Sequence, residues 1–419
     1  MSNNDYILNL LNIKDPNIFI FNNSIEEKVI NGKNHKIIEA VLTYKPDFCP
    51  CCGVVNESTN DIIKWGFRNN CKVKIPNISN CRSLLLLNKQ RFYCKHCNNT
   101  FLAETNLVDK YKNISNNSEL QIRLELTKKQ SEKDIANRVN VSTSKINRVL
   151  DDISSKKLLR HASLPINMNW DEFKSTNNMA FMIMDNDKGS IFDIKPSRKS
   201  LDLEHYFKTY PRKDRDKVKL ISMDFYSGYI HLAKKLFKNA DIVIDRYHIV
   251  TQVYNALNIT RVRLCYKSNP YYNKLKHYWK LILKNKNDLS DKKYYSKYFK
   301  KEISQKEIVT FLINTNKELK RTYECYQGII NSINDRDFTK FKNIIYNQDK
   351  HLPDKMKKAL KLFRNNIEYI ENSFKYDINN GIIEGTNNLI KSLKRIAFGY
   401  RKHSHYINRI FLIKGLIKG

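Results

Sequence analysis

Apolar and polar residues alternate in different ways along the chain, and each pattern predicts a different kind of element. Near the N-terminus, residues 35–44 (HKIIEAVLTY) alternate with the two-residue period of a strand. Residues 81–87 and 89–93 show the same period, and they predict the two strands of a hairpin. This part of the chain is therefore expected to contain β-strands.

Two short helices with a tight break between them are predicted next. Ser131 precedes an acidic turn and resembles a helix N-cap. Residues 140–142 form the break, and residues 143–153 restart the helical period. The apolar stripes of the two helices consist of Ile135, Ala136, Val139, Ile146, Val149, Leu150 and Ile153. The pattern predicts a helix-turn-helix unit, and a plain helical hairpin is the alternative.

From about residue 165 onward, strand-like and helix-like runs alternate. The strand-like runs are NMNWD, MAFMIMD, SIFDIKP, VKLISMDF and ADIVID. This order predicts an α/β fold around a sheet of mixed direction. Residues 265–380 then show helical patterns and no strand candidate, so an all-α segment is expected there. A last helix is expected to begin near Gly381.

Length and composition agree with a chain of several folded domains. The chain has 419 residues, of which 41% are hydrophobic, so it is longer than a typical domain and can bury sizeable cores. No apolar run approaches the roughly 18 residues of a membrane span, and the N-terminus lacks the pattern of a secretory signal. A cytoplasmic protein without a membrane partner is expected.

A large positive charge points to a polyanionic partner. The chain has 75 Lys and Arg residues against 42 Asp and Glu residues, which gives a net charge of +33. Such an excess destabilises a compact chain through self-repulsion unless a polyanion offsets it. Nucleic acid is the first expectation, and a membrane surface is the second.

Cysteines are concentrated in one region, which indicates a metal site. Seven of the nine cysteines lie between Cys49 and Cys97, and in an intracellular chain such a group suggests thiols or metal ligands rather than disulfides. Cys49 and Cys52 form one Cys-x-x-Cys knuckle, and Cys94 and Cys97 form another. Two knuckles supply the four ligands of a structural Zn²⁺ ion.

Other donors of this region bear on the zinc prediction. Cys51 and His96 are spare donors, so the fourth ligand could be exchanged. Cys71 and Cys81 are interpreted as buried thiols. A hairpin across the 41 residues between Cys52 and the second knuckle would bring the two knuckles together. Reduced core cysteines are the alternative to a metal site.

The second helix of a helix-turn-helix unit enters the major groove of double-stranded DNA, and the first helix crosses the backbone. The outward face of the second helix carries side chains that bind base edges and phosphates. These residues are Thr143, Ser144, Lys145, Asn147 and Arg148. They are the predicted DNA-reading residues.

Three carboxylates stand where a catalytic site can form. Asp171 ends the first strand-like run, Asp224 ends VKLISM, and Glu384 opens the last helix. Polar residues at the ends of buried strands lie at the rim of an α/β sheet, where sites form. Three carboxylates there can hold two Mg²⁺ or Mn²⁺ ions. Ordinary caps of strands and helices are the alternative.

The last helix has a polar and an apolar face. The polar face consists of Glu384, Asn388, Lys391 and Arg395, and the apolar face of Leu389, Leu393 and Ile396. Such a helix would present its acid and its phosphate-binding cations to the same DNA strand.

Several blocks of sequence together resemble the ISL-three group of DDE transposases from bacterial insertion sequences. The blocks are CPCCG, YCKHCNNTF, WDEF, LISMDFYSGYIHLAKKLFKNADIVIDRYHIV, WKLILKNKNDLS and IIEGTNNLIKSLKRIAFGYR, besides the helix-turn-helix. They are spread over most of the chain. The departures are Trp170, where the family usually has an aliphatic residue, and the extra Cys51.

The resemblance implies an RNase H-like catalytic core that a helical insertion interrupts before the last acid. It implies that Asp171, Asp224 and Glu384 are the catalytic acids that bind the metal ions. It also implies that Asp245 and His248 are accessory residues, which orient the site or contact DNA. The alternative is that Asp245 caps the following helix and that His248 packs under it.

These inferences predict a multidomain chain. The expected parts are an N-terminal segment (1–45), a zinc-binding domain (46–110), a helix-turn-helix domain (118–155), the first part of the RNase H-like core (165–264), a helical insertion (265–380) and the last part of the core with the third acid (381–419). Lysines and aromatic residues are interleaved over residues 274–301. That pattern suggests base stacking, with core packing as the alternative.

The predicted function is that of an insertion-sequence transposase, which binds terminal inverted repeats and carries out Mg²⁺-dependent strand cleavage and strand transfer. It would act in the bacterial cytoplasm, at the nucleoid. A homodimer or a larger assembly is expected, because two DNA ends must be joined. The alternative is a sequence-specific DNA-binding repressor or a domesticated relative that does not cut.

Overall fold

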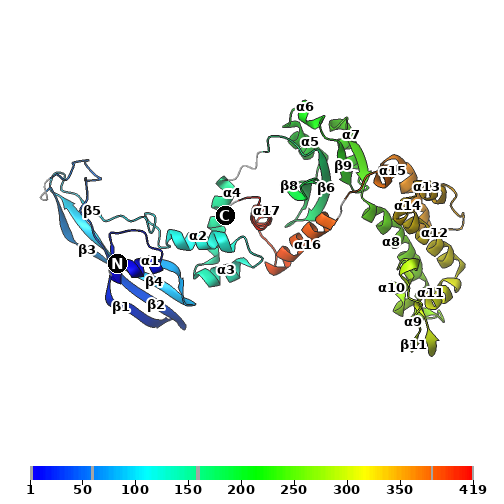
Figure 1. Ribbon diagram of the computed structural model, residues 1–419, viewed down its shortest axis with the longest axis horizontal. Coiled ribbons are helices and arrows are strands. Elements are labelled where there is room, and N and C mark those ends of the chain that lie inside the picture. The colour runs from blue at the N-terminus through cyan, green and yellow to red at the C-terminus, as the bar shows by residue number, and fades with distance from the viewer. Residues whose placement is uncertain (1–2, 58–60, 157–160, 379–380, 418–419) are drawn as a thin grey trace. The chain divides into compact units, whose positions relative to one another are not determined.

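The computed structural model describes residues 3–57, 61–156, 161–378 and 381–417. The chain divides into two compact units, of which one consists of Met1–Leu158 and Asn388–Gly419 and the other of Leu159–Asn387. The first unit is therefore built from both ends of the chain, whereas the second is continuous in sequence. Figure 1 shows the helices and strands of both units.

The first unit begins with a short helix and a five-stranded sheet. The helix is α1 (Asn3–Leu10), and the strands are β1 (Ile18–Ile30), β2 (Lys33–Leu42), β3 (Ile62–Ile78), β4 (Cys81–Cys94) and β5 (Thr100–Leu102). Their order is β1-β2-β4-β3, with β5 also paired to β4. β2 and β4 run parallel, and the other pairs run antiparallel.

The hairpin predicted within residues 81–93 is wrong, because residues 81–87 and 89–93 belong to the single strand β4. This strand pairs with β3 from Cys81 to Cys94, opposite Ile78 and Ile62 respectively. Asn88 separates the two predicted runs, and its side-chain oxygen accepts the Asn70 N–H at 2.8 Å. β3 has an irregular register at this point. The polar position therefore marks a bulge in the partner strand rather than a turn.

A group of helices with its own apolar core belongs to the same unit. It contains α2 (Asn116–Glu125), α3 (Glu132–Val139), α4 (Thr143–Lys156) and, from the far end of the chain, α17 (His403–Ile413). The core consists of Ile122, Leu126, Ile135, Ala136, Val139, Ile146, Val149, Leu150, Ile153 and Leu412. Both predicted apolar stripes are thus confirmed. The predicted N-cap is confirmed too, because the Ser131 side chain accepts the Asp134 N–H.

One buried arginine holds α17 to the end of α2 and to the loop before α3. Arg409 is fully buried, and it donates to the carbonyl oxygens of Leu126, of Lys128 at 3.0 Å and of Gln130 at 2.7 Å. These carbonyls lie at and just beyond the C-terminal end of α2, where helical N–H partners are missing. His405 adds a contact of 2.7 Å to Asp151 on α4.

The second unit contains a five-stranded mixed sheet. Its strands are β6 (Asn167–Lys174), β7 (Met179–Asp185), β8 (Ser190–Lys195), β9 (Leu220–Met223) and β10 (Asp241–Ile244), in the order β10-β9-β6-β7-β8. β6, β9 and β10 are parallel to one another, whereas β6, β7 and β8 pair antiparallel. All five predicted strand-like runs are confirmed, and so is the mixed direction.

Helices connect and cover these strands. They are α5 (Ser200–Lys208), α6 (Arg212–Arg215), α7 (Ser227–Leu236) and α8 (Arg246–Leu264). Trp170 of β6 is buried and stacks on Phe207 of α5, with their ring centroids 5.1 Å apart. Trp170, which stands where an aliphatic residue is usual, is therefore a core residue that packs the sheet against α5.

Residues 265–380 are mainly helical, with one exception. The helices are α9 (Tyr272–His277), α10 (Trp279–Ile282), a short 3₁₀ turn (Lys286–Asp288), α11 (Gln305–Asn314), α12 (Lys317–Asn334), α13 (Phe338–Tyr346), α14 (Asp354–Asn365) and α15 (Ile367–Lys375). The exception is an antiparallel pair, β11 (Tyr294–Ser296) and β12 (Lys301–Ile303), so the expectation of an all-α segment is wrong. The turn between β11 and β12 includes Lys300, which has a φ of 55°. The charged residues around these short strands obscure the two-residue alternation by which a strand is recognised.

The helical segment shares one core with the sheet. α15 packs on β10, and α12 packs on α8, so the apolar cluster extends from Ile244 to Phe363 without interruption. The last long helix, α16 (Gly381–Ile396), begins where the sequence predicts it. Among the helices of the described ranges, we find none that is both long and apolar enough to cross a membrane.

Candidate functional site

Three aspartates meet at one edge of the mixed sheet. β6 and β9 are paired up to Asn169 opposite Ser222. In this parallel register, Asp171 and Asp224 each lie two residues further on and therefore come side by side. Asp245 directly follows β10, and its N–H donates to the carbonyl oxygen at the end of β9 at 3.0 Å. Parallel strands align their carboxyl ends, which is where sites form in such sheets.

Asp171 does not end its strand as predicted. β6 continues to Lys174 along its antiparallel partner β7. It is the pairing with β9 that stops before Asp171. The aspartate therefore lies just beyond the β6–β9 pairing, at the edge where these two parallel strands separate.

Burial and mutual repulsion disfavour the charged forms of these aspartates. Burial raises the pKa of Asp171; hydrogen bonds from Asn387 and from the Glu172 N–H oppose the shift, and the charge of Asp224 adds to it. Burial likewise raises the pKa of Asp245, with contributions from the charges of Asp224 and Asp171. A bound cation would relieve this repulsion.

His248 lies in the first turn of α8 and faces the same cluster. Its Nε2 is 3.0 Å from Asp224 Oδ1. Burial lowers the pKa of His248, but the hydrogen bond to Asp224 and the nearby carboxylates outweigh it, so the pKa lies above its usual value. Asp245 also caps α8, since its Oδ1 accepts the Tyr247 N–H at 2.8 Å. The capping alternative for Asp245 is thus confirmed, and both residues lie beside the acids.

The side chain of Glu384 is exposed on α16. In the described ranges, neither Glu384 nor the three aspartates belong to a group of three possible ligands whose donor atoms all lie within 4.8 Å of one another. The α16 residue that reaches the acids is Asn387, whose Nδ2 donates to Asp171 Oδ2 at 2.6 Å. Asn387 was not among the predicted site residues, although a spacing of three places it on the same helix face as Glu384.

A second cluster, of four thiols, lies in the first unit. The sulfur atoms of Cys49, Cys52, Cys94 and Cys97 all lie within 4.8 Å of one another. The Sγ–Sγ distances are 3.7 Å for Cys49–Cys97 and 3.9 Å for Cys52–Cys94. Ligands at about 2.3 Å in a tetrahedron are about 3.8 Å apart, so the four thiols fit a Zn²⁺ ion. The predicted ligand set is brought together as the sequence indicates.

The β3–β4 hairpin is what joins the two knuckles, because it pairs Ile62 with Cys94. The neighbouring donors Cys51 and His96 are not part of the thiol cluster. Cys71 and Cys81 are half-buried rather than buried. The reason is the strand period, which places only every second side chain of β3 and β4 in the core.

The thiols of one knuckle differ in acidity. Desolvation disfavours the Cys49 thiolate, but the N–H groups of Cys52 and Cys51 outweigh it and lower its pKa to about 7. The Val54 N–H favours the Cys52 thiolate, yet desolvation and the other thiols prevail and raise its pKa to about 12. Four close thiols cannot all ionise without a cation between them.

Comparison with known proteins identifies the family. Residues 169–410 match a family described as "Transposase", the ISL-three group of DDE transposases. The match covers more than half of the chain and includes Asp171, Asp224 and Glu384. The chain belongs to this family.

A curated protein also shows partial similarity. It is named "ATP-dependent protease" and comes from Lactococcus lactis subsp. lactis. It is 31% identical to the chain over 121 residues, which are 28% of this chain and 39% of that protein. The chain therefore covers about two fifths of that relative's length.

Helix α4 presents most of the predicted DNA-reading residues to solvent. Thr143, Ser144 and Arg148 are exposed, and Asn147 is half-buried. Lys145 is a correction to the predicted outward face: its Nζ lies 2.6 Å from a carboxylate oxygen of Glu119 on α2, and its side chain is only 14% exposed. Ion pairing across the helices draws this lysine inward.

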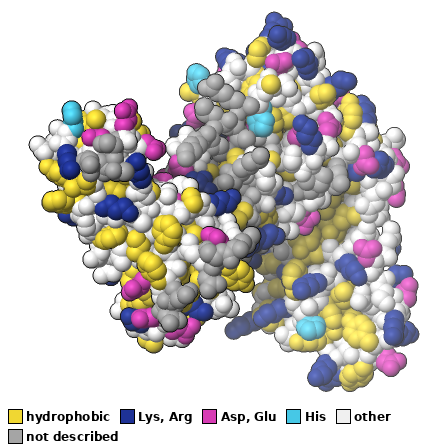
Figure 2. Space-filling model, turned by 60° about the vertical axis from the view of Figure 1, so that its left-hand side comes forward, with side chains coloured by type: hydrophobic (Ala, Val, Ile, Leu, Met, Phe, Trp, Pro, Cys, Tyr) yellow, Lys and Arg dark blue, Asp and Glu magenta, His cyan; other side chains and the backbone are white. Residues whose placement is uncertain are grey.

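The polar face of α16 is also exposed at the predicted positions. Asn388, Lys391 and Arg395 lie outside, and Leu389 and Leu393 are buried. Ile396 is 37% exposed rather than buried, because α16 ends at this residue. On the face shown in Figure 2, lysine and arginine side chains are spread widely among apolar and acidic ones.

The aromatic residues of the helical segment divide between the two interpretations. Tyr278 is buried, and Trp279 and Phe299 pack against the core. Tyr294, Tyr295 and Tyr298 are exposed. Core packing is thus confirmed for the first three rings, and base stacking stays a prediction for the three exposed tyrosines.

Proposed function

We propose that this chain is the transposase of a bacterial insertion sequence, which binds terminal inverted repeats and cuts and joins DNA strands. The observation that carries this proposal is the pair Asp171 and Asp224, side by side at the edge of a mixed sheet within the family region. The strand order β10-β9-β6-β7-β8 supports the RNase H-like core that the resemblance implies.

DDE transposases use divalent metal ions, and the residues at this edge fit such ions. Carboxylate oxygens are the ligands that Mg²⁺ and Mn²⁺ prefer. Asp171 and Asp224 would hold the ions, with Glu384 of α16 as the third acid. When bound, such ions would activate the attacking hydroxyl and stabilise the leaving oxygen of the phosphodiester. In the proposed cleavage, water attacks a phosphodiester and leaves a 3′-hydroxyl and a 5′-phosphate. In strand transfer, this 3′-hydroxyl attacks a target phosphodiester and displaces its 3′-oxygen.

Asp245 and His248 act as positioning residues in this proposal. The cap from Asp245 fixes the first turn of α8. This turn carries His248, whose contact of 3.0 Å restrains the Asp224 carboxylate. Restrained ligands keep a metal site in its productive geometry.

DNA recognition is assigned to the exposed face of α4 and to the polar face of α16. The residues proposed to read or hold DNA are Thr143, Ser144, Asn147, Arg148, Asn388, Lys391 and Arg395. Lys145 instead fixes α4 to α2 through Glu119. The four-cysteine cluster is proposed to hold a structural Zn²⁺ ion, and the chain is proposed to act as a dimer or a larger assembly, because two ends are joined.

Strand cleavage of labelled element ends tests the proposal. Asp171→Asn, Asp224→Asn and Glu384→Gln each remove one negative charge and keep the size of the side chain. Each variant should bind the ends like the parent and lose Mg²⁺-dependent cleavage by several orders of magnitude.

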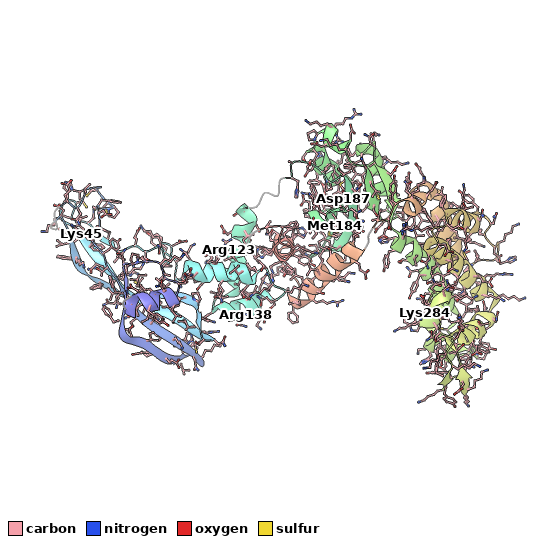
Figure 3. The ribbon with its side chains drawn as sticks, viewed as in Figure 1. Lys45, Arg123, Arg138, Met184, Asp187 and Lys284 are labelled. Atoms are coloured by element: carbon pink, nitrogen blue, oxygen red, sulfur yellow. The ribbon has the colours of Figure 1, made fainter. Side chains whose placement is uncertain are left out.

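Asp187→Asn is the matched control. Asp187 lies in the turn after β7 (Figure 3), and its exposed carboxylate accepts a hydrogen bond from Asn167 at 2.8 Å. Asp185 is less suitable, because it is buried and accepts the N–H groups of Asp187 and Lys188. Near-parental cleavage by Glu384→Gln would remove that residue from the site. A parent that binds ends but never cuts would favour the repressor alternative.

A further inference from the structure

Asn387 makes the contact that ties α16 to the acids. Its Nδ2 donates to Asp171 Oδ2 at 2.6 Å, across 216 positions of sequence. The other oxygen of the same carboxylate accepts the Glu172 N–H at 2.7 Å. Asp171 is therefore held at both oxygens, and one of the two restraints comes from the last helix.

The oxygen atom of the Asn387 side chain lacks a hydrogen-bond donor among the described residues. Its Oδ1 is buried, and within the described parts of the chain no hydrogen-bond donor reaches it. Turning the amide over would place this oxygen against the Asp171 carboxylate, where two acceptors repel each other. Buried amide oxygens nearly always have a partner. In this orientation, Asn387 Oδ1 is an acceptor that a donor or a cation would stabilise.

A cation is the group that fits this acceptor. The aspartate that Asn387 contacts is desolvated by burial, and the charge of Asp224 raises its pKa further, so a cation beside it would be favourable. Amide oxygens join carboxylates as ligands of hard divalent cations. Because the amide lies beside a proposed metal ligand, a cation bound there would be close to Asn387 Oδ1.

We propose that Asn387 is part of the divalent-cation site: its NH₂ group orients Asp171, and its Oδ1 is offered to the cation or to a water bound to it. This inference rests on the proposed function, since it needs the acids to bind metal. It gives α16 two residues at the site, Asn387 and, one turn earlier on the same face, Glu384. The neighbouring Asn388 is exposed instead.

Cation affinity is the test, because it does not depend on cleavage. Mn²⁺ binding to the full-length, zinc-loaded protein without DNA is measured by electron paramagnetic resonance and by calorimetry. Asn387→Leu should weaken Mn²⁺ binding about ten-fold or more, as loss of such partners does in other metal sites. Asn343→Leu, at an exposed position of helix α13, is the matched control and should bind like the parent. Parental Mn²⁺ affinity in Asn387→Leu would overturn the proposal.

A second substitution separates the two roles of the amide. Asn387→Asp keeps an oxygen at this position and removes the donor to Asp171. It should bind Mn²⁺ more tightly than Asn387→Leu, because its carboxylate supplies a ligand. If it binds no better than the leucine variant, the assignment of Oδ1 is wrong. Asn387→Ala takes the place of the leucine variant if thermal unfolding shows that leucine disrupts the fold.

Asp171→Asn distinguishes failure of this inference from failure of the proposed function. Loss of Mn²⁺ binding in Asp171→Asn together with parental binding in Asn387→Leu would refute only the role of Asn387. Unchanged binding in Asp171→Asn would show that the acid edge is not the metal site, and both proposals would fall.

Discussion

Replacing Arg409 with methionine should weaken the attachment of α17 to the end of α2 and thereby destabilise this group of helices. Methionine fills a similar volume but cannot donate to the three carbonyl oxygens that Arg409 binds. A hydrogen bond from a charged donor contributes about 1.5–3 kcal/mol. Leu126 is buried, whereas the backbone at Lys128 and Gln130 is nearer to water. We therefore expect a loss of about 3–5 kcal/mol in the local stability of these helices.

Hydrogen exchange of the full-length protein measures this loss. A change of 3 kcal/mol corresponds to a little more than a hundred-fold in the opening equilibrium, at about 1.4 kcal/mol per factor of ten. The amides of residues 122–126 and 146–153 should therefore exchange about a hundred-fold faster in Arg409→Met. The amides of β6 and β7, in the other unit, should keep their protection.

Arg401→Met is the matched control, because Arg401 is exposed. It should leave exchange in α2 and α4 unchanged. Parental protection of both helices in Arg409→Met would refute the proposed role of this arginine. Faster exchange throughout both units would also refute it, since the effect would then not be local to the contacts of this arginine.

Three further predictions concern other parts of the chain. The purified protein should contain about one zinc ion per chain, and Cys94→Ser should release it and loosen the N-terminal sheet, which metal analysis and proteolysis check. Arg148→Ala should weaken binding to inverted repeats more than binding to random duplex, which DNA-binding titrations measure. Lys145→Ala should mainly lower the stability of the packing between α2 and α4, which hydrogen exchange measures. Trp170→Ala should cost about 3–5 kcal/mol of stability in the second unit, measured by denaturant unfolding, because it removes a fully buried ring from the core.

Most helices and strands of the fold could be predicted from hydrophobic periodicity, because they follow from local patterns. The five strands of the mixed sheet, the helix-turn-helix stripes and the start of α16 near Gly381 were all predictable from the chain alone. The errors arose where a partner strand or a run of charge altered the pattern. Asn88 interrupts the alternation of β4 because its partner strand bulges there, and the short strands β11 and β12 are masked by lysines.

Residue types and spacing determined the chemistry of the candidate sites. Four cysteines in two knuckles specify a thiol cluster, because the Cys-x-x-Cys spacing already places two sulfurs together. Asp171 and Asp224 follow from the strand pattern, because a parallel register brings strand ends to one edge. These features depend on short stretches of chain, and the sequence by itself was sufficient for them.

Tertiary structure decided which side chains meet across long distances in sequence. The contact of Asn387 with Asp171, the inward turn of Lys145 toward Glu119 and the burial of Arg409 depend on how whole elements pack. Such contacts carry no local period, because the partners lie tens to hundreds of positions apart and each side chain alone resembles an ordinary surface residue. The packing of α16 and α17 was therefore decided only by the folded chain.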